Sequence, residues 1–403
     1  MTKQSPLTAY LTNYGHAHTL PEHLSKNWNH VLILPLCGEA EDCITQLLAN
    51  VKTDQVLVIA CLNRPEGLAE TGQWQLANEQ ILAAMKRLAQ QATKLVSETD
   101  GYLLEFNGYD VWFLNYNNKP FADNQGVGLA RKIAADTASQ LIQQGRVNSP
   151  WIYSSDADVM LPPDYFLTPD DDGEVVAYSL PFEHCSEDSD LAFWQSLYDF
   201  KLHYYRQGVR YIGAQYDYIP LGSCLIVHAD GYARVRGFPR KSGGEDFYLL
   251  NKLAKLGAIA QPQTPLITIR CRYSKRVPFG TGPALIKMTE QQHQPLFYQP
   301  QVFAEIKIWR QSLLDFYETA ELPENSVLNQ FWNTAKVLVK ARLQSKSPQR
   351  WQQFVHEWFD AFKILKSVHA LEADYPRLSL AELKYMDLFH VLTEGLVVPE
   401  WGG

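Results

Sequence analysis

The chain of 403 residues lacks the features that mark several common protein classes. Its 36 lysines and arginines are outnumbered by 44 aspartates and glutamates, which gives a formal charge of −8. This charge argues against a nucleic-acid-binding protein, because phosphate backbones require a broad basic surface. None of the cysteines forms a C-x-x-C pair, so neither a zinc knuckle nor a thioredoxin-type motif is expected. We expect reduced, mostly buried thiols at Cys37, Cys43, Cys61, Cys185, Cys224 and Cys271.

Long apolar runs are also missing from the sequence. Residues 1–6 lack the apolar core of a signal peptide, and no stretch approaches the roughly 20 apolar residues that span a bilayer. We therefore expect a cytoplasmic protein that crosses no membrane, with peripheral contact to a membrane surface left open. Because 46% of the residues are hydrophobic, the chain can bury a large core, and we expect one big domain and a smaller one.

The first two-thirds of the chain alternates short apolar runs with amphipathic stretches. Residues 31–35, 56–62 and 111–114 are continuous apolar runs of the kind that predicts fully buried strands. Amphipathic spacing predicts helices after the first run and from about Gln75 to Val96. Strands separated by helices predict an α/β fold with a mainly parallel, doubly wound sheet that is covered on both faces.

Two carboxylates, Asp156 and Asp158, follow a further buried strand predicted at residues 151–155. Ligands of open α/β sheets bind beyond the carboxyl ends of the strands. A carboxylate pair offers hard oxygen ligands to Mg²⁺ or Mn²⁺, which take their other ligands from water and substrate phosphates. Solvated turn aspartates are the alternative interpretation. The same spacing occurs without a preceding apolar strand at Asp170/Asp172 and Asp188/Asp190.

About ninety residues later, two glycines and two acids, Gly243 to Asp246, introduce a predicted helix over 247–257. The glycines allow close backbone approach to a ligand or a positive φ. Acids in the first turn of a helix often only cap it. A carboxylate on a rigid helix start can also deprotonate an attacking hydroxyl, which is general-base catalysis. We predict that Asp246 is such a base.

A glycine-rich turn at residues 124–128 leads into a predicted helix that carries Arg131 and Lys132. Free amides at a helix start bind anions, and a guanidinium can bind phosphate with two hydrogen bonds. We therefore predict a phosphate contact at Arg131, with solvated cations on a helix start as the equal alternative. The turn is not a full G-x-G-x-x-G and comes too late in the chain for a dinucleotide fold, which argues against NAD.

In combination these motifs resemble the family 2 glycosyltransferases and their GT-A relatives. The resemblance covers roughly residues 30–280 and implies a GT-A-like α/β fold with a doubly wound mixed sheet. It also implies transfer of a sugar from a nucleoside diphosphate sugar to a hydroxyl acceptor. The motifs that carry it are the strand ending near Pro35, the G-x-G-x-A-R helix, Asp156-x-Asp158, residues 222–225 and residues 243–246.

The resemblance assigns roles to individual residues. It places Pro35 and Glu39 near the nucleotide base, and it gives the metal (Mn²⁺ or Mg²⁺) and the donor diphosphate to Asp156 and Asp158. The catalytic acids are Glu245 and Asp246, with Asp246 as the base of an inverting enzyme. By the same resemblance, Gly222, Ser223, Gly243 and Gly244 are expected to line the acceptor pocket.

A basic segment follows the last predicted motif. Four cations lie within residues 270–276 and precede a Phe-Gly-Thr-Gly turn, which predicts a loop able to close over a leaving diphosphate. We take Arg276 as its donor-binding residue. His293 is a candidate third metal ligand, although an isolated histidine is more often an ordinary surface or core residue.

After about residue 300 the apolar spacing is helical throughout. We therefore expect an N-terminal arm at 1–29, a GT-A-like catalytic domain at 30–290 and a helical C-terminal region at 300–403. That region contains five cations without an intervening acid: Lys336, Lys340, Arg342, Lys346 and Arg350. A solvated helix face is the usual interpretation of such a run, and binding of anionic lipid or of a phosphorylated acceptor is the alternative.

Three other functions compete with the inverting transferase. A retaining GT-A enzyme would carry the same metal pair. A sugar-phosphate nucleotidyltransferase would need a glycine-rich loop where residues 36–39 read Leu-Cys-Gly-Glu. An inactive glycosyltransferase-like binding module is disfavoured by the presence of all four acids at 156, 158, 245 and 246. The acceptor candidates are a surface polysaccharide, as in polysaccharide biosynthesis, a lipid-linked sugar and a small glycoside.

Overall fold

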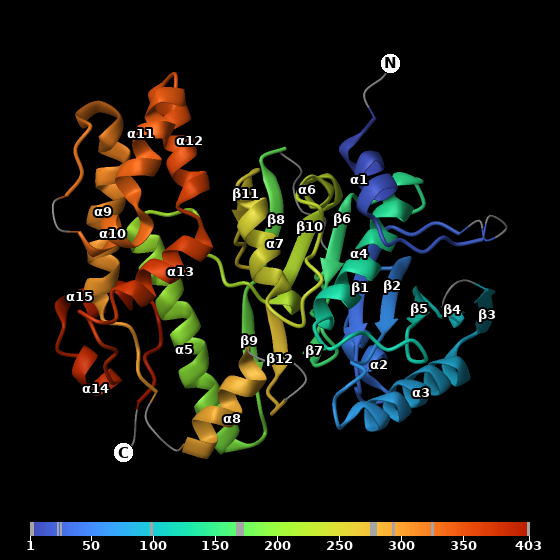
Figure 1. The fold of residues 1–403 in the computed structure, drawn as a ribbon. Coiled ribbons are helices and arrows are strands. Elements are labelled where there is room, and N and C mark those ends of the chain that lie inside the picture. The colour runs from blue at the N-terminus through green and yellow to red at the C-terminus, as the bar shows by residue number, and fades with distance from the viewer. Residues whose placement is uncertain are drawn as a thin grey trace. The chain divides into compact units, whose positions relative to one another are not determined.

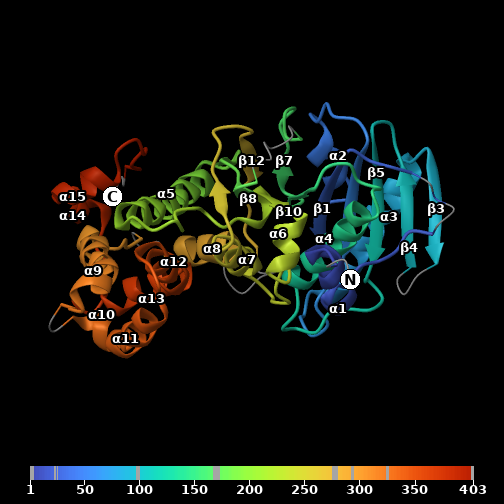
Figure 2. The same ribbon diagram turned by 90° about the horizontal axis from the view of Figure 1, so that it is seen from above.

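The computed structural model describes residues 4–21, 24, 26–96, 100–166, 173–274, 280–291, 295–323 and 326–400. The chain divides into two compact units (Figures 1 and 2). Unit 1 comprises Met1–Ala192 and Pro220–Ala284, and unit 2 comprises Phe193–Ile219 and Leu285–Gly403.

Unit 1 is built on a nine-stranded mixed sheet with the order β11-β8-β10-β6-β1-β2-β5-β4-β3. The strands β6, β1, β2 and β5 at its centre are parallel, whereas β10 is antiparallel to β6 and β8, and β4 is antiparallel to β3 and β5. The strands are β1 (His30–Leu36), β2 (Val56–Leu62), β3 (Gln91–Val96), β4 (Asp100–Glu105), β5 (Tyr109–Asn115), β6 (Trp151–Ser154), β8 (Val175–Ser179), β10 (Leu225–His228) and β11 (Ala258–Ala260).

The central strands are buried along their whole length, as their continuous apolar sequences predict. Every residue of β1 and β2 is buried. Alternate residues such as Leu32 and Leu34 share a core with α2 (Cys43–Leu48) and with Ile81 and Met85 of α3 (Thr71–Leu88). Helix α4 (Val127–Gln143) also packs against β1 and β2. The predicted strands at the centre of the sheet are therefore confirmed.

The helix predicted from Gln75 to Val96 is wrong in its last third. Helix α3 ends at Leu88, Ala89 is extended with ψ 141°, and Gln91–Val96 forms strand β3. This strand pairs with β4 in an antiparallel hairpin. Pairing with β4 therefore makes Gln91–Val96 a strand, although the spacing of its apolar residues suggested a helix.

A second, three-stranded sheet lies beside the first in unit 1, with the order β7-β12-β9. In it β12 (Ile267–Arg270) runs antiparallel to β7 (Val159–Met160) and parallel to β9 (Phe182–Cys185). The Arg270 amide donates to the carbonyl of Asp158 over 2.8 Å. This pairing brings the basic segment after β12 next to the Asp156-x-Asp158 turn.

Helix α1 (Pro6–Tyr14) is fastened to α4 through the fully buried carboxylate of Asp136. That carboxylate accepts hydrogen bonds from the hydroxyls of Tyr10 and Tyr232 over 2.7 and 2.8 Å. It also pairs with Lys132, whose Nζ lies 3.0 Å away. A buried charge is tolerated when it is paired and hydrogen-bonded, so this cluster fixes α4 in place.

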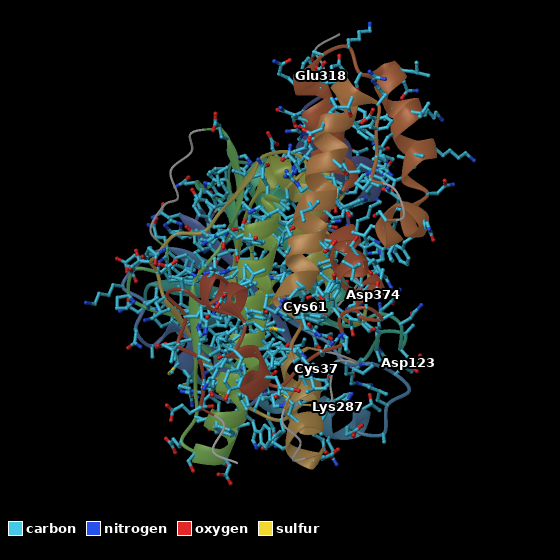
Figure 3. The ribbon with its side chains drawn as sticks, turned by 90° about the vertical axis from the view of Figure 1, so that its left-hand side faces the viewer. Cys37, Cys61, Asp123, Lys287, Glu318 and Asp374 are labelled. Carbon is cyan, nitrogen blue, oxygen red and sulfur yellow. The ribbon has the colours of Figure 1, made fainter. Side chains whose placement is uncertain are left out.

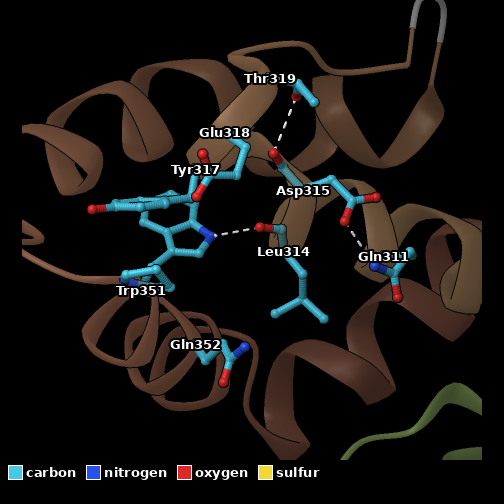
Figure 4. A pocket seen from close by; sticks show the side chains of 9 residues that line it. Gln311, Leu314, Asp315, Tyr317, Glu318, Thr319, Trp351 and Gln352 are labelled. Carbon is cyan, nitrogen blue, oxygen red and sulfur yellow. Dashed lines mark hydrogen bonds between the residues drawn. The ribbon is translucent and has the colours of Figure 1, made fainter.

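Unit 2 is helical in its described residues. Its buried aromatic side chains include Trp309, Phe316 and Trp351. A surface cavity of about 350 Å³ lies between α9 and α12, where the Trp351 indole donates to the carbonyl of Leu314 (Figure 4). The same indole also donates to the carbonyl of Leu313. The helices are α9 (Pro300–Thr319), α10 (Val327–Trp332), α11 (Thr334–Gln344), α12 (Pro348–Trp358), α13 (Ala361–Ala370), α14 (Leu380–Leu383) and α15 (Asp387–Leu392), with most of α5 (Ser189–Ile212) and of α8 (Thr281–Gln291).

None of the six cysteines forms a disulfide, as expected, but only Cys43, Cys61 and Cys224 are buried, so the expectation that most of the thiols are buried is wrong. Cys61 is fully buried in β2, whereas Cys37 just after β1 is half-buried (Figure 3). Among the described residues, no helix is long and apolar enough to cross a membrane.

Candidate functional site

Charged side chains from four separate segments of unit 1 meet at one edge of the main sheet. Strands β1 and β6 are parallel neighbours, so the residues that follow them leave the sheet at the same edge. Glu39 follows β1, whereas Asp156 and Asp158 follow β6. Ion pairs connect these acids to Arg131 on α4 and to Arg272 after β12.

The charged side chains form two groups, each centred on one arginine, and Arg131 is the centre of the first. Its guanidinium is only 3% exposed and forms ion pairs with Asp156 and Glu245. Its Nε donates to the Ser154 hydroxyl over 3.3 Å, and that hydroxyl donates to the carbonyl of Gly222 over 2.7 Å. A buried guanidinium is thus shared by two carboxylates that lie 89 positions apart in the numbering.

Two glycines permit the close approach of neighbouring backbone here, because a Cβ at either position would be crowded by it. A Cβ on Gly128 would lie 2.6 Å from the carbonyl oxygen of Lys241, and one on Gly126 would lie 3.2 Å from the Cα of Ser242. The G-x-G turn therefore lets the loop before α7 (Glu245–Leu253) approach the first turn of α4. The Gly128 amide donates to Lys241 O over 3.0 Å, so this amide of the helix start is already paired.

Gly222→Ala should destabilise the folded protein by about 1–3 kcal/mol, because the new Cβ would lie 2.4 Å from Cζ of the pinned Arg131 side chain. Urea unfolding at neutral pH measures the effect. Gly72→Ala is the matched control: it lies in α3 with no heavy atom within 4 Å and should be neutral or more stable by up to about 1 kcal/mol. Equal effects at the two positions would show that Arg131 moves aside freely.

Arg272 is the centre of the second group. Its Nε lies 2.7 Å from Asp158 Oδ2, and its Nη2 donates to Glu39 Oε1 over 3.0 Å. The side chain remains 33% exposed, in contrast to that of Arg131. From this basic segment we predicted Arg276 as the donor contact. Arg276 lies outside the described residues, as does the candidate metal ligand His293. No signal in the sequence singles out Arg272, because its position near Asp158 depends on the pairing of β12 with β7.

Asp246 occupies the first turn of α7, directly after the Gly244-Glu245 step. Gly244 has a φ of 70°, a left-handed conformation that glycine adopts without strain. Burial, reinforced by the negative charge of Glu245, raises the pKa of Asp246 to about 7. Arg131 and the Phe247 amide, which donates to Oδ1 over 2.7 Å, oppose this rise. A carboxyl group with this pKa can exchange a proton near neutral pH.

The pKa of Asp158 is raised as well. Burial raises its pKa to about 6, against the attraction of Arg272, while the charges of Asp156 and Glu39 add to the rise. Asp156 and Asp158 are thus close enough for their like charges to interact. Their side chains are 34% and 20% exposed, so both are partly open to solvent.

The remaining predicted site residues are Pro35, Gly222, Ser223, Gly243 and Gly244. Pro35 is buried within β1, opposite Cys61 of β2. Gly222 and Ser223 are buried in a short 3-10 helix, Gly222–Cys224. Gly243 is buried and Gly244 half-buried. Of this set, the structure joins Gly222 to the first group through Ser154.

The fit of Asp156 and Asp158 to a divalent cation is partial. Their oxygens are the hard ligands that Mg²⁺ and Mn²⁺ prefer. In the part of the chain that the structure describes, no three histidine, cysteine, aspartate or glutamate side chains are arranged to hold a metal ion. A cation at this pair would therefore take its other ligands from water and from phosphate.

Comparison with known proteins gives little further information. No protein-family model matches the chain, and no curated protein matches it. Among solved structures, it is similar to the mannosyltransferase PcManGT from Pyrobaculum calidifontis in complex with GDP-Man and Mn²⁺. The identity is 14%, the match covers 96% of this chain and 86% of that chain, and the TM-score is 0.33. This likeness is too distant to bear on the function.

Proposed function

We propose that the chain is a GT-A-like glycosyltransferase that moves a sugar from a nucleoside diphosphate sugar to a hydroxyl acceptor. The observation that carries the proposal is the shared guanidinium of Arg131, which holds Asp156 and Glu245 together beside Asp246. This group lies where ligands of open α/β sheets bind. The catalytic domain in this proposal is residues 30–290, with the arm 1–29 before it and the helical region 300–403 after it.

Asp246 would act as the general base. It would take the proton of the acceptor hydroxyl as the oxygen attacks the anomeric carbon, and the product would have inverted configuration. Glu245 is 3% exposed and paired with Arg131, so its role would be to position Arg131 and the start of α7. Gly222, Ser223, Gly243 and Gly244 would border the acceptor, a carbohydrate or a lipid-linked sugar.

The two arginines would have different tasks. Arg131 was predicted to contact the donor phosphate, but it is buried and bound to two carboxylates, which supports instead a role in positioning the Asp156 side chain. Arg272 is partly exposed and would exchange its carboxylate partners for the oxygens of the donor diphosphate. Pro35, Glu39 and Arg276 remain predicted contacts of the donor.

Asp156 and Asp158 would hold Mn²⁺ or Mg²⁺. The cation would supply positive charge that stabilises the departing nucleoside diphosphate. Arg272 would then leave Asp158 and add a second positive charge at the phosphates.

A thermal-shift panel of UDP-, GDP-, ADP- and dTDP-sugars, each with and without Mn²⁺, tests the donor and the metal together. One nucleotide should stabilise the wild type selectively and only with metal, by about 2.7 kcal/mol at a hundred times its Kd. Asp156→Asn with Asp158→Asn should abolish the shift. Asp188→Asn with Asp190→Asn, which has the same spacing at α5, should retain it.

The outcomes separate the competing functions. If no nucleotide shifts the unfolding transition, the donor-binding proposal fails. A shift that survives in Asp156→Asn/Asp158→Asn overturns the metal role. A metal-dependent shift without any donor hydrolysis or transfer would indicate the inactive binding module, and the anomeric configuration of a product distinguishes inversion from retention.

A further inference from the structure

Helix α11 presents an outward face on which apolar and basic side chains alternate. At about 100° per residue, Lys336, Val339, Lys340 and Leu343 fall within an arc of about 100°. The opposite side of the helix carries the buried residues Thr334, Leu338 and Ala341. Val339 is 53% exposed and Leu343 is 85% exposed. We call the four outward residues the α11 face.

The chain segment that contains the α11 face is basic and carries further exposed apolar side chains. Residues 325–356 include no aspartate or glutamate, although the whole chain carries a net charge of −8. Lys346 and Arg350 follow the helix and are exposed. On α10, Phe331 is 50% exposed and Val327 is 42% exposed. Arg342 points elsewhere, because its Nε donates to the carbonyl of Tyr317 over 2.8 Å.

We propose that the α11 face docks on the surface of an anionic lipid bilayer. Such a surface fits both the basic and the apolar side chains of the face. The lysines attract the negative headgroups, and Val339 and Leu343 enter the boundary of the acyl chains. Nucleic acid would satisfy the lysines but would leave both apolar side chains in water. The proposal does not depend on the sugar-transfer activity, and it assigns a membrane-facing role to unit 2.

Co-sedimentation of the full chain with vesicles tests this docking. Vesicles of phosphatidylcholine with 30% phosphatidylglycerol should bind the protein, and pure phosphatidylcholine should not. Lys336→Gln, Lys340→Gln and Lys346→Gln together should weaken binding about 100-fold, since each basic residue near an anionic surface contributes about 1 kcal/mol. Val339→Ser with Leu343→Ser should weaken it about tenfold or more without changing the charge.

Matched variants remove the same groups elsewhere. Lys52→Gln, Lys119→Gln and Lys384→Gln delete three exposed charges, and Leu76→Ser with Val391→Ser deletes two apolar side chains that are 62% and 57% exposed. These controls should bind like the wild type, and all variants should keep the wild-type circular dichroism and Tm.

Raising the salt to 0.5 M should release the wild type, because the screening length then falls below about 5 Å. Absence of binding to anionic vesicles overturns the proposal. So does equal binding to neutral vesicles, or binding that the α11 variants and the controls weaken equally. No donor or acceptor is present in this assay, so its result is separate from that of the donor panel.

Discussion

Asp246→Asn is expected to lower the turnover of sugar transfer by about 10²- to 10⁴-fold, the usual contribution of a general base. Donor binding should change little, because the predicted donor contacts lie on other residues. The amide is nearly isosteric with the carboxyl group and can still accept the hydrogen bond from the Phe247 amide. Turnover with saturating donor and acceptor, together with the donor-induced thermal shift, measures both quantities.

A control separates catalysis from helix capping. Asp387 also lies in the first turn of a helix, α15, and is exposed. Asp387→Asn should change stability by no more than about 1 kcal/mol and leave turnover unaltered. If Asp246→Asn also kept full turnover and only lowered the Tm, Asp246 would be a cap and not the base.

The pH dependence of turnover should also reflect the ionisation of Asp246. Because burial and Glu245 raise the pKa of Asp246 to about 7, turnover should rise with pH through 7 as the carboxyl group loses its proton. The folded protein disfavours the ionised form, so this group lowers stability progressively as pH rises from about 4 to 7, and the penalty is complete above pH 7. Asp246→Asn should therefore be at least as stable as the wild type at pH 8.

The parts of the fold that the sequence predicts are those governed by local burial. Strands β1 and β2 are recognisable because parallel strands covered on both faces need an apolar residue at every position. The helix after Gly126 is recognisable by its apolar spacing, and α4 spans Val127–Gln143. Strand β3 cannot be recognised in this way, because its conformation depends on pairing with β4 and not on the spacing of its own apolar residues.

The site is harder to predict because long-range packing assembles it. The sequence indicates that Asp156 and Asp158 leave the sheet together, but it does not show that Arg272 reaches Asp158, which requires β12 to pair with β7. Similarly, the G-x-G turn before Arg131 suggests a phosphate contact. In the structure its second glycine packs against the carbonyl of Lys241.

Arg131→Met should destabilise the protein by about 3–5 kcal/mol, because it leaves the buried carboxylate of Glu245 and that of Asp156 without their cation. The loss should be larger at pH 8 than at pH 5, because the pKa of Asp246 is raised to about 7 by burial, and its ionised form at pH 8 is a further negative charge that Arg131 stabilises. Urea unfolding at the two pH values measures it. Arg87→Met is the control: Arg87 pairs with Glu41 at the surface over 3.7 Å, and its loss should cost no more than about 1 kcal/mol.

A double-mutant cycle with Glu245→Gln decides whether this pair is the cause. Glu245→Gln alone leaves Arg131 with Asp156 and an uncharged neighbour, so it should cost less than Arg131→Met. Added to Arg131→Met, the same change removes the unpaired buried charge and should restore part of the lost stability, most clearly at pH 8. Strictly additive losses would contradict the central role of this ion pair. If the cycle shows coupling, and if Arg131→Met also lowers turnover, the Arg131 guanidinium both stabilises the folded protein and holds the Asp156 and Glu245 side chains in position.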